Sequence, residues 1–269
     1  MARKSHAKRS QHNPNYHEGG KDSRRAKQRS RTSHRDKPQS ADILELNARY
    51  LETAYTPQRT KAPLEAKTPA QKSYINAIKN NCLTFGLGPA GTGKSYCAAA
   101  LAAQALESGT IERIILTRPA VEAGEQLGFL PGAVDDKFAV YIDAFRDILN
   151  ERLGAGAVEY GLRHGRIVAA PLAYMRGKTF NNKTFVILDE AQNTTPSQMK
   201  MFLTRIGEEC KVVINGDIKQ SDIRGPNGLA DAVERVKGLH SVFVHRFERE
   251  DIVRSGLVKE LIDRYEPFE

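Results

Sequence analysis

The stretch that decides the fold is Gly88-Pro89-Ala90-Gly91-Thr92-Gly93-Lys94-Ser95, which fits the pattern G-x-x-x-x-G-K-[ST]. An apolar run, residues 82–87, precedes it and an alanine-rich run follows it, and this strand and helix context is what a phosphate-binding loop requires. Glycines let such a loop fold its N–H groups around phosphates, and the following helix adds the positive end of its dipole. We therefore expect a nucleotide site in which Lys94 reaches the β- and γ-phosphates and Ser95 coordinates Mg²⁺.

A second motif, which is acidic, distinguishes hydrolysis from other uses of such a loop. Residues 185–190 (FVILDE) form an apolar run that ends in Asp189 and Glu190. Successive side chains of a strand alternate between its faces, and a turn at its end can bring both carboxylates toward the nucleotide. Asp189 suits the outer coordination sphere of Mg²⁺, and Glu190 suits the base that orients water against the γ-phosphate. A solvated acidic turn is the alternative interpretation.

A third polar cluster follows the apolar run at residues 212–215, where Asn215, Asp217 and Gln220 lie close together in the sequence. In parallel-sheet nucleotide triphosphatases, a polar group at the end of a neighbouring strand senses the γ-phosphate. These three side chains are therefore candidates for that role, and an ordinary Gly-Asp turn is the alternative.

Short apolar runs alternate with helical segments from residue 83 onward. This alternation predicts an α/β fold, with a parallel sheet and helices on both of its faces. The expected strands are residues 83–87, 113–117, 166–170, 185–189, 212–215 and 241–244. The expected helices are residues 93–106, 139–153, 197–206, 228–236 and 257–265.

The net charge of +9 lies entirely in the first forty residues, which hold twelve Lys and Arg against three acidic side chains. Residues 1–40 are poor in apolar side chains, so we expect a disordered basic arm. Such an arm attaches to nucleic acid by counterion release, and a solubilising tail is the alternative. Residues 41–67 are expected to form an amphipathic helix and a Pro-containing linker, and residues 68–269 the catalytic domain.

The remaining composition narrows the class of protein. At 269 residues with 40% hydrophobic side chains, the chain can bury a sizeable core. It contains no apolar run long enough to span a bilayer and no leader with an apolar core, so we expect no membrane partner. The Arg- and Ser-rich start leaves a transit peptide open. Three cysteines without metal-like spacing suit a reducing, cytoplasmic location.

Several longer stretches point to one family. They are residues 85–95 (FGLGPAGTGKS), 116–125 (LTRPAVEAGE), 127–132 (LGFLPG), 170–177 (APLAYMRG), 188–205 (LDEAQNTTPSQMKMFLTR) and 251–254 (DIVR). With these stretches the chain resembles, from about Thr68 to Pro267, the PhoH family of phosphate-starvation-inducible ATPases related to superfamily 1 helicase motor domains. It departs from the usual family pattern at Lys178, Asn215, Lys219, Arg224 and Ser255.

The resemblance implies a RecA-like P-loop domain that binds ATP and Mg²⁺. Gln192 and Gln220 match positions near the γ-phosphate in related helicases, Gln220 being a candidate catalytic residue. Gln71 has the spacing of an adenine-reading glutamine.

The resemblance also implies a ring, most simply a hexamer, in which a neighbouring subunit supplies an arginine finger. Arg254 is the first candidate and Arg246 the second. Arg118 and Arg176 are assigned instead to nucleic-acid phosphates or to structural ion pairs.

Together these features predict an ATP-hydrolysing, nucleic-acid-associated motor or helicase. Single-stranded RNA is favoured over DNA, because the excess charge lies in an Arg- and Ser-containing arm and the core resembles half of a helicase. The rival hypothesis is an ATP-dependent assembly or regulatory switch that acts on protein partners. A nucleic-acid-binding protein with vestigial nucleotide chemistry is disfavoured, because Lys94, Ser95, Asp189 and Glu190 are all intact.

Overall fold

The computed structural model describes residues 62–119, 134–253, 256 and 264, with side chains in the helix that begins at 134 described from residue 142 onward. The predicted basic arm, the amphipathic helix at 41–56 and most of the linker lie outside the described residues. So does almost all of the helix predicted at 257–265.

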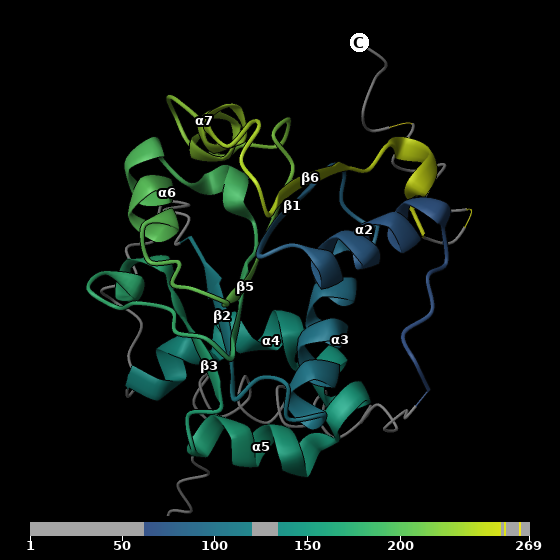
Figure 1. The fold of residues 1–269 in the computed structure, drawn as a ribbon, viewed down its shortest axis with the longest axis vertical. Coiled ribbons are helices and arrows are strands. Elements are labelled where there is room, and N and C mark those ends of the chain that lie inside the picture. The colour runs from purple at the N-terminus through teal and green to yellow at the C-terminus, as the bar shows by residue number, and fades with distance from the viewer. Residues whose placement is uncertain (1–61, 120–133, 254–255, 257–263, 265–269) are drawn as a thin grey trace, which may run out of the picture. The chain divides into compact units, whose positions relative to one another are not determined.

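The centre of the structure is a sheet of six parallel strands (Figure 1). In spatial order they are β3 (Ile167–Pro171), β2 (Arg113–Arg118), β4 (Thr184–Leu188), β5 (Lys211–Gly216), β1 (Leu83–Leu87) and β6 (Val242–Arg246). Their side chains are mostly apolar and the inner strands are buried on both faces, as parallel sheets require. Each predicted strand is confirmed to within two residues at either end.

Helices cover both faces of the sheet, as predicted (Figure 1). α2 (Pro69–Asn80), α3 (Lys94–Glu107), α4 (Val134–Leu153) and α5 (Ala155–Arg163) lie on one face, and α6 (Pro196–Leu203) and α7 (Gly228–Arg235) lie on the other. β4 shows how the two cores are divided. Phe185 and Ile187 face the first group of helices, while Val186 and Leu188 face the second.

Two helices escaped the sequence analysis. α2 begins at Pro69, just beyond the expected linker, because proline suits the first turn of a helix, and the Thr68 side chain caps it by accepting from the Gln71 N–H. α5 contains Gly156 and Gly161, which are poor helix formers. Gly161 is nevertheless favoured there, because a Cβ at this position would lie 2.8 Å from Cδ1 of Ile167 in β3.

The described part of the chain bears on two expectations, one about membrane-spanning segments and one about the cysteines. Within it, no helix combines the length and the apolar character needed to cross a membrane. The three cysteines are free thiols, with Cys97 and Cys210 buried and Cys82 exposed. Burial raises the pKa of Cys97 to about 11, which keeps this thiol protonated and unreactive near neutrality.

The position of β2 inside the sheet predicts a large cost for truncating its core side chain. Leu116 is fully buried and is paired with Ala169 of β3 and Ile187 of β4. Leu116→Ala should lower the free energy of unfolding by about 2–5 kcal/mol, since it leaves a cavity between the sheet and its helices. Leu239→Ala is the control, because Leu239 is 57% exposed and its truncation should change stability by less than about 0.5 kcal/mol. Urea unfolding measures both, and equal effects would contradict this core placement.

Candidate functional site

A cavity of about 310 Å³ lies where the carboxyl ends of β1, β2, β4 and β5 meet. In parallel α/β sheets this edge is where ligands bind. The phosphate-binding loop forms one wall, and the residues that follow β4 and β5 form the opposite wall. The lining residues are Gly88, Ala90, Gly91, Gly93, Lys94, Ser95, Tyr96, Arg118, Ala144, Asp189, Glu190, Gln192, Gly216, Asp217 and Gln220.

Backbone geometry explains the glycines of the phosphate-binding loop. Gly88 has φ 129° and Gly93 has φ 86°, which are conformations that side chains with a Cβ rarely adopt. A Cβ at Gly88 would also lie 2.3 Å from the carbonyl oxygen of Phe247, in the segment that follows β6. The loop leads directly into α3, whose N-terminus therefore points its free N–H groups into the cavity.

The segment after β6 is bound at one end to the last residue of β1 and at the other end to this loop. The Phe247 N–H donates to the Leu87 carbonyl at 2.7 Å, and the Val253 N–H donates to the Gly91 carbonyl at 2.9 Å. Val253 is the last residue described before Arg254, the predicted finger, which lies outside the described residues. Arg246, the second candidate for the finger, and Arg176 are exposed and do not line the cavity, whereas Arg118 does.

Lys94 is held by the loop it belongs to. Its ammonium donates to the carbonyl oxygens of Gly88 at 2.7 Å and Pro89 at 2.6 Å, and to Oγ1 of Thr92 at 3.3 Å. Burial lowers the pKa of Lys94, while the negative charges of the nearby carboxylates oppose that shift. A cation held among neutral carbonyls can exchange them for phosphate oxygens, which are stronger partners.

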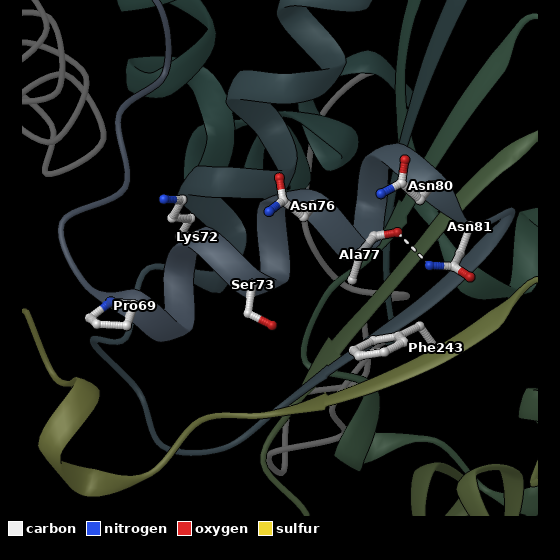
Figure 2. Close-up of a pocket in the computed structure, with 8 residues that line it drawn as sticks. All are labelled: Pro69, Lys72, Ser73, Asn76, Ala77, Asn80, Asn81 and Phe243. Atoms are coloured by element: carbon white, nitrogen blue, oxygen red, sulfur yellow. Dashed lines mark hydrogen bonds between the residues drawn. The ribbon is translucent and has the colours of Figure 1, made fainter.

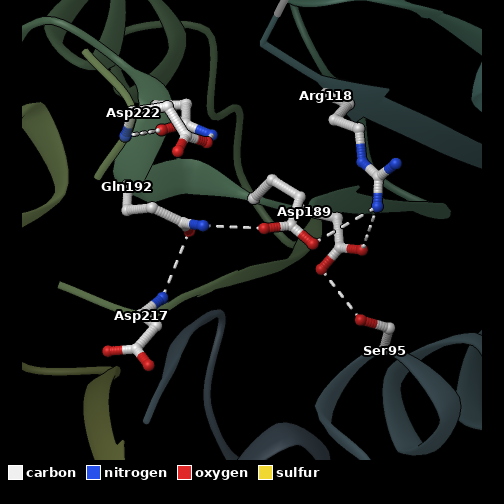
Figure 3. Close-up of polar contacts among 8 residues, drawn as sticks. Ser95, Arg118, Asp189, Gln192, Asp217 and Asp222 are labelled. Atoms are coloured by element: carbon white, nitrogen blue, oxygen red, sulfur yellow. Dashed lines mark hydrogen bonds and ion pairs between the residues drawn. The ribbon is translucent and has the colours of Figure 1, made fainter. Parts of the chain in front are cut away.

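Ser95 and Asp189 meet across the cavity, as Figure 3 shows. The Ser95 hydroxyl donates to Oδ1 of Asp189 at 2.9 Å. Asp189 is placed by the sheet, since its N–H donates to the Thr117 carbonyl at the end of β2. Burial raises the pKa of Asp189, and the Arg118 charge and the Ser95 hydrogen bond oppose that shift. A hydroxyl beside a desolvated carboxylate is a donor set that fits Mg²⁺, which takes oxygen ligands and would compensate the buried charge.

Glu190 stands next to this pair in a left-handed conformation, with φ 52°. The Glu190 side chain is 46% exposed, whereas that of Asp189 is 7% exposed. Oε1 of Glu190 lies 3.4 Å from Nη2 of Arg118, and Oε2 of Glu190 accepts from Nε2 of Gln192 at 2.7 Å. Two partners therefore fix a carboxylate that water can still reach, which is the arrangement a general base needs.

Gln192 connects Glu190 to the loop after β5. The Gln192 Oε1 accepts from the Asp217 N–H at 3.1 Å, as Figure 3 shows. The next residue continues the connection, because Asn193 donates from Nδ2 to Asp222 at 3.0 Å and accepts from the Asp222 N–H at 2.9 Å. The sequence analysis missed Asn193 and Asp222. The signal that could have indicated them is their closeness in the sequence to Gln192 and Gln220.

Asn215 and Gln71 lie outside the cavity lining, which changes how they are understood. Asn215 is fully buried and accepts a hydrogen bond from the Tyr74 hydroxyl of α2, and its role as a nucleotide contact stays a prediction. Gln71 donates to the Thr92 carbonyl at 2.9 Å and accepts from the Lys67 N–H at 2.8 Å. It supports the phosphate-binding loop, and adenine reading by its amide stays a prediction.

Three further predicted residues can be placed. Gln220 lines the cavity, and its N–H donates to the Asp217 carbonyl at 3.0 Å. Pro89 and Thr92 are in the loop but outside the lining, where they hold the Lys94 ammonium.

A larger hollow of about 490 Å³ lies along α2 beside Phe243 of β6 (Figure 2). Its lining is Pro69, Lys72, Ser73, Asn76, Ala77, Asn80, Asn81 and Phe243. It contains one charged side chain, that of Lys72, and no carboxylate, whereas the cavity at the sheet edge is lined by two cationic side chains and three carboxylates. The smaller cavity at the sheet edge is therefore the candidate active site.

Comparison with solved structures finds likenesses at low sequence identity. The Pif1 helicase from Candida albicans matches with a TM-score of 0.37 and 11% identity, over 77% of this chain and 49% of that one. The UvsW helicase from bacteriophage T4 matches with a TM-score of 0.42 and 13% identity, over 76% and 67%. Similarity at this level carries no information about activity.

Comparison with known sequences is more specific. A PhoH-like protein of Bacillus subtilis is 48% identical over 81% of this chain and 70% of its own length. Protein PhoH of Escherichia coli is 49% identical over 77% of this chain, which spans 59% of that protein's length. A PhoH-like protein of Mycobacterium tuberculosis gives 47% identity over the same shares. The PhoH family model, described as PhoH-like protein, matches residues 63–266. A phosphate-binding loop facing two carboxylates on a parallel α/β sheet thus occurs together with a match to the PhoH family model and to PhoH-like proteins, and the chain belongs to the PhoH family.

Proposed function

We propose that this P-loop domain binds ATP with Mg²⁺ and hydrolyses it. One observation supports this above all others. Lys94 and Ser95 of the phosphate-binding loop line the same cavity as Asp189 and Glu190, so the groups that hold a triphosphate and the groups that activate water face one another.

Each group then has a distinct task. The N–H groups at the start of α3 and the Lys94 ammonium bind the β- and γ-phosphates. Mg²⁺, when bound near Ser95 and Asp189, neutralises charge that develops on the transferring phosphoryl group. Glu190 orients and polarises the attacking water, and Gln192 holds that carboxylate in place through its 2.7 Å hydrogen bond.

Changing Glu190 to glutamine tests the hydrolytic step. Glu190→Gln keeps the shape of the side chain but removes its basicity, so kcat should fall by roughly 10²–10⁴-fold while ATP binding is retained. Glu209→Gln is a matched control, because Glu209 also has a positive φ, 59°, and lies outside the cavity. Steady-state ATPase rates and equilibrium ATP binding measure the two effects. Turnover of Glu190→Gln at the parental rate would show that the assigned base is wrong.

We further propose that hydrolysis serves a nucleic-acid-associated motor or helicase, with single-stranded RNA as the favoured partner. The supporting observation is the charge distribution, since all of the excess charge of +9 lies in residues 1–40. Cationic segments of this kind bind phosphate backbones by releasing counterions. A switch acting on protein partners is the rival. It predicts an ATPase rate that neither single-stranded RNA nor single-stranded DNA changes.

Free thiols at all three cysteines accord with the reducing cytoplasm.

Removing the basic arm tests the nucleic-acid proposal. Deletion of residues 1–40 should weaken binding of single-stranded RNA and flatten its dependence on salt, because each lost phosphate contact lowers the slope of log K against log[salt] by about 0.7. Binding of the full-length and truncated chains is measured by fluorescence anisotropy at several salt concentrations, with single-stranded DNA compared in parallel. Equal affinity and slope for the two chains would remove the arm from the mechanism.

The last part of the proposal concerns assembly. We propose a homo-oligomeric ring, most simply a hexamer, in which Arg254 of one subunit serves the nucleotide site of the next. A trans arginine is worth roughly 10³–10⁵ in rate in related nucleotide triphosphatases, and head-to-tail contacts that close generate rings.

Subunit mixing tests this arrangement. Arg254→Ala and Lys94→Ala chains should each be inactive alone, whereas the mixed assembly should recover part of the ATPase activity, because some intact arginines then face intact sites. Cross-linking verifies that the two chains co-assemble. A co-assembled mixture without activity, or a dilute monomer that hydrolyses ATP at the full rate, would contradict a trans finger.

A further inference from the structure

We propose that Arg118 contacts the γ-phosphate of bound ATP and makes the site select triphosphates over diphosphates. Sequence analysis assigned Arg118 to nucleic-acid phosphates or to a structural ion pair. The structure instead places it in the lining of the candidate active site. This inference rests on the proposed ATP site and adds a specificity-determining residue to it.

The sheet fixes where Arg118 points. Thr117 is opposite Leu188 in the register of β2 and β4, so Arg118, at the end of β2, lies beside Asp189. Ile114 and Leu116 face the helices that include α3. Alternation along the strand places Arg118 on that same side, toward the start of α3 and its phosphate-binding loop.

The charges around the cavity require a cation at this place. Asp189 and Glu190 form the wall opposite the phosphate-binding loop, and two carboxylates would repel a γ-phosphate that approached them. Lys94 lies on the loop side, where its ammonium donates to the carbonyls of Gly88 and Pro89. Arg118 is the cation that lies beside these two carboxylates. Its Nη2 is 3.3 Å from Oδ2 of Asp189 (Figure 3) and 3.4 Å from Oε1 of Glu190.

The Arg118 guanidinium also has N–H donors that these two contacts do not use. The two carboxylate contacts both use Nη2, and they are longer than the roughly 2.7–2.9 Å of strong charge-assisted hydrogen bonds. Nε is buried without a partner among the described residues. An arginine presents five N–H groups in a planar fork that matches phosphate oxygens. Arg118 can therefore turn donors toward a γ-phosphate while it still faces Glu190.

Comparing a triphosphate with a diphosphate tests the inference with a readout other than catalysis. Calorimetry in the presence of Mg²⁺ measures the affinity of the full chain for ADP and for the non-hydrolysable imido analogue of ATP. Arg118→Gln should weaken analogue binding roughly 10- to 100-fold, the value of a hydrogen bond to a charged group, and change ADP binding less than about twofold. Arg118→Lys keeps the charge and should lose less. Arg113→Gln is the matched control, an arginine at the opposite, exposed end of the same strand.

The outcomes separate this inference from the proposed function. Equal weakening of ADP and the analogue by Arg118→Gln would overturn it, since Arg118 would then only hold the carboxylates in place. Unchanged binding of both nucleotides would overturn it as well, while leaving the ATP site intact. Failure of the wild-type chain to bind either nucleotide would overturn the ATP site and the inference together. If thermal melting shows that Arg118→Gln does not fold, the ratio of the two affinities in Arg118→Lys decides, and an unchanged ratio would overturn the inference.

Discussion

The parallel pairing of β1, β5 and β4 is the constraint on which the candidate site depends. Neighbouring strands lie about 4.8 Å apart, so placing β5 between β1 and β4 separates the phosphate-binding loop from the acidic strand end by about two strand spacings. That gap is wide enough for phosphate groups and their metal ion, yet narrow enough that the Ser95 hydroxyl reaches Asp189. An adjacent pairing of β1 and β4 would leave little room between the two walls.

Electrostatic balance is the second requirement, because the site is only partly open to water. Asp189 and Lys94 are both buried, and burial shifts the pKa of each toward its neutral form. Each nevertheless has partners of opposite charge nearby, which favour the charged forms. The site therefore holds its charges through mutual compensation, and the proposed triphosphate with its metal ion would replace one set of partners by another without leaving an isolated charge.

The sequence allowed most of the fold and the centre of the site to be predicted. The loop at residues 88–95 and the acidic end at residues 185–190 have recognisable chemistry and both follow predicted strands, so a parallel sheet places them at the same edge; the strand order then sets the distance between them. Asn215 and Gln71 show where such reasoning stops. Asn215 is a candidate because it ends an apolar run and Gln71 because of its spacing from the loop, yet their side chains turn toward Tyr74 and toward the loop backbone, because the direction of a side chain depends on tertiary packing. Arg118 shows the converse, since no local pattern indicates that β2 ends beside β4.

The hydrogen bonds from Phe247 and Val253 have a mechanical consequence. The first ties the segment after β6 to Leu87 at the end of β1, and the second ties it to Gly91 in the phosphate-binding loop. Val253 is the outer of these two points, so tension applied to the chain beyond it would reach Gly91 before it reached the sheet. A load on the carboxyl-terminal segment would in this way act on the proposed nucleotide-binding loop through one backbone hydrogen bond.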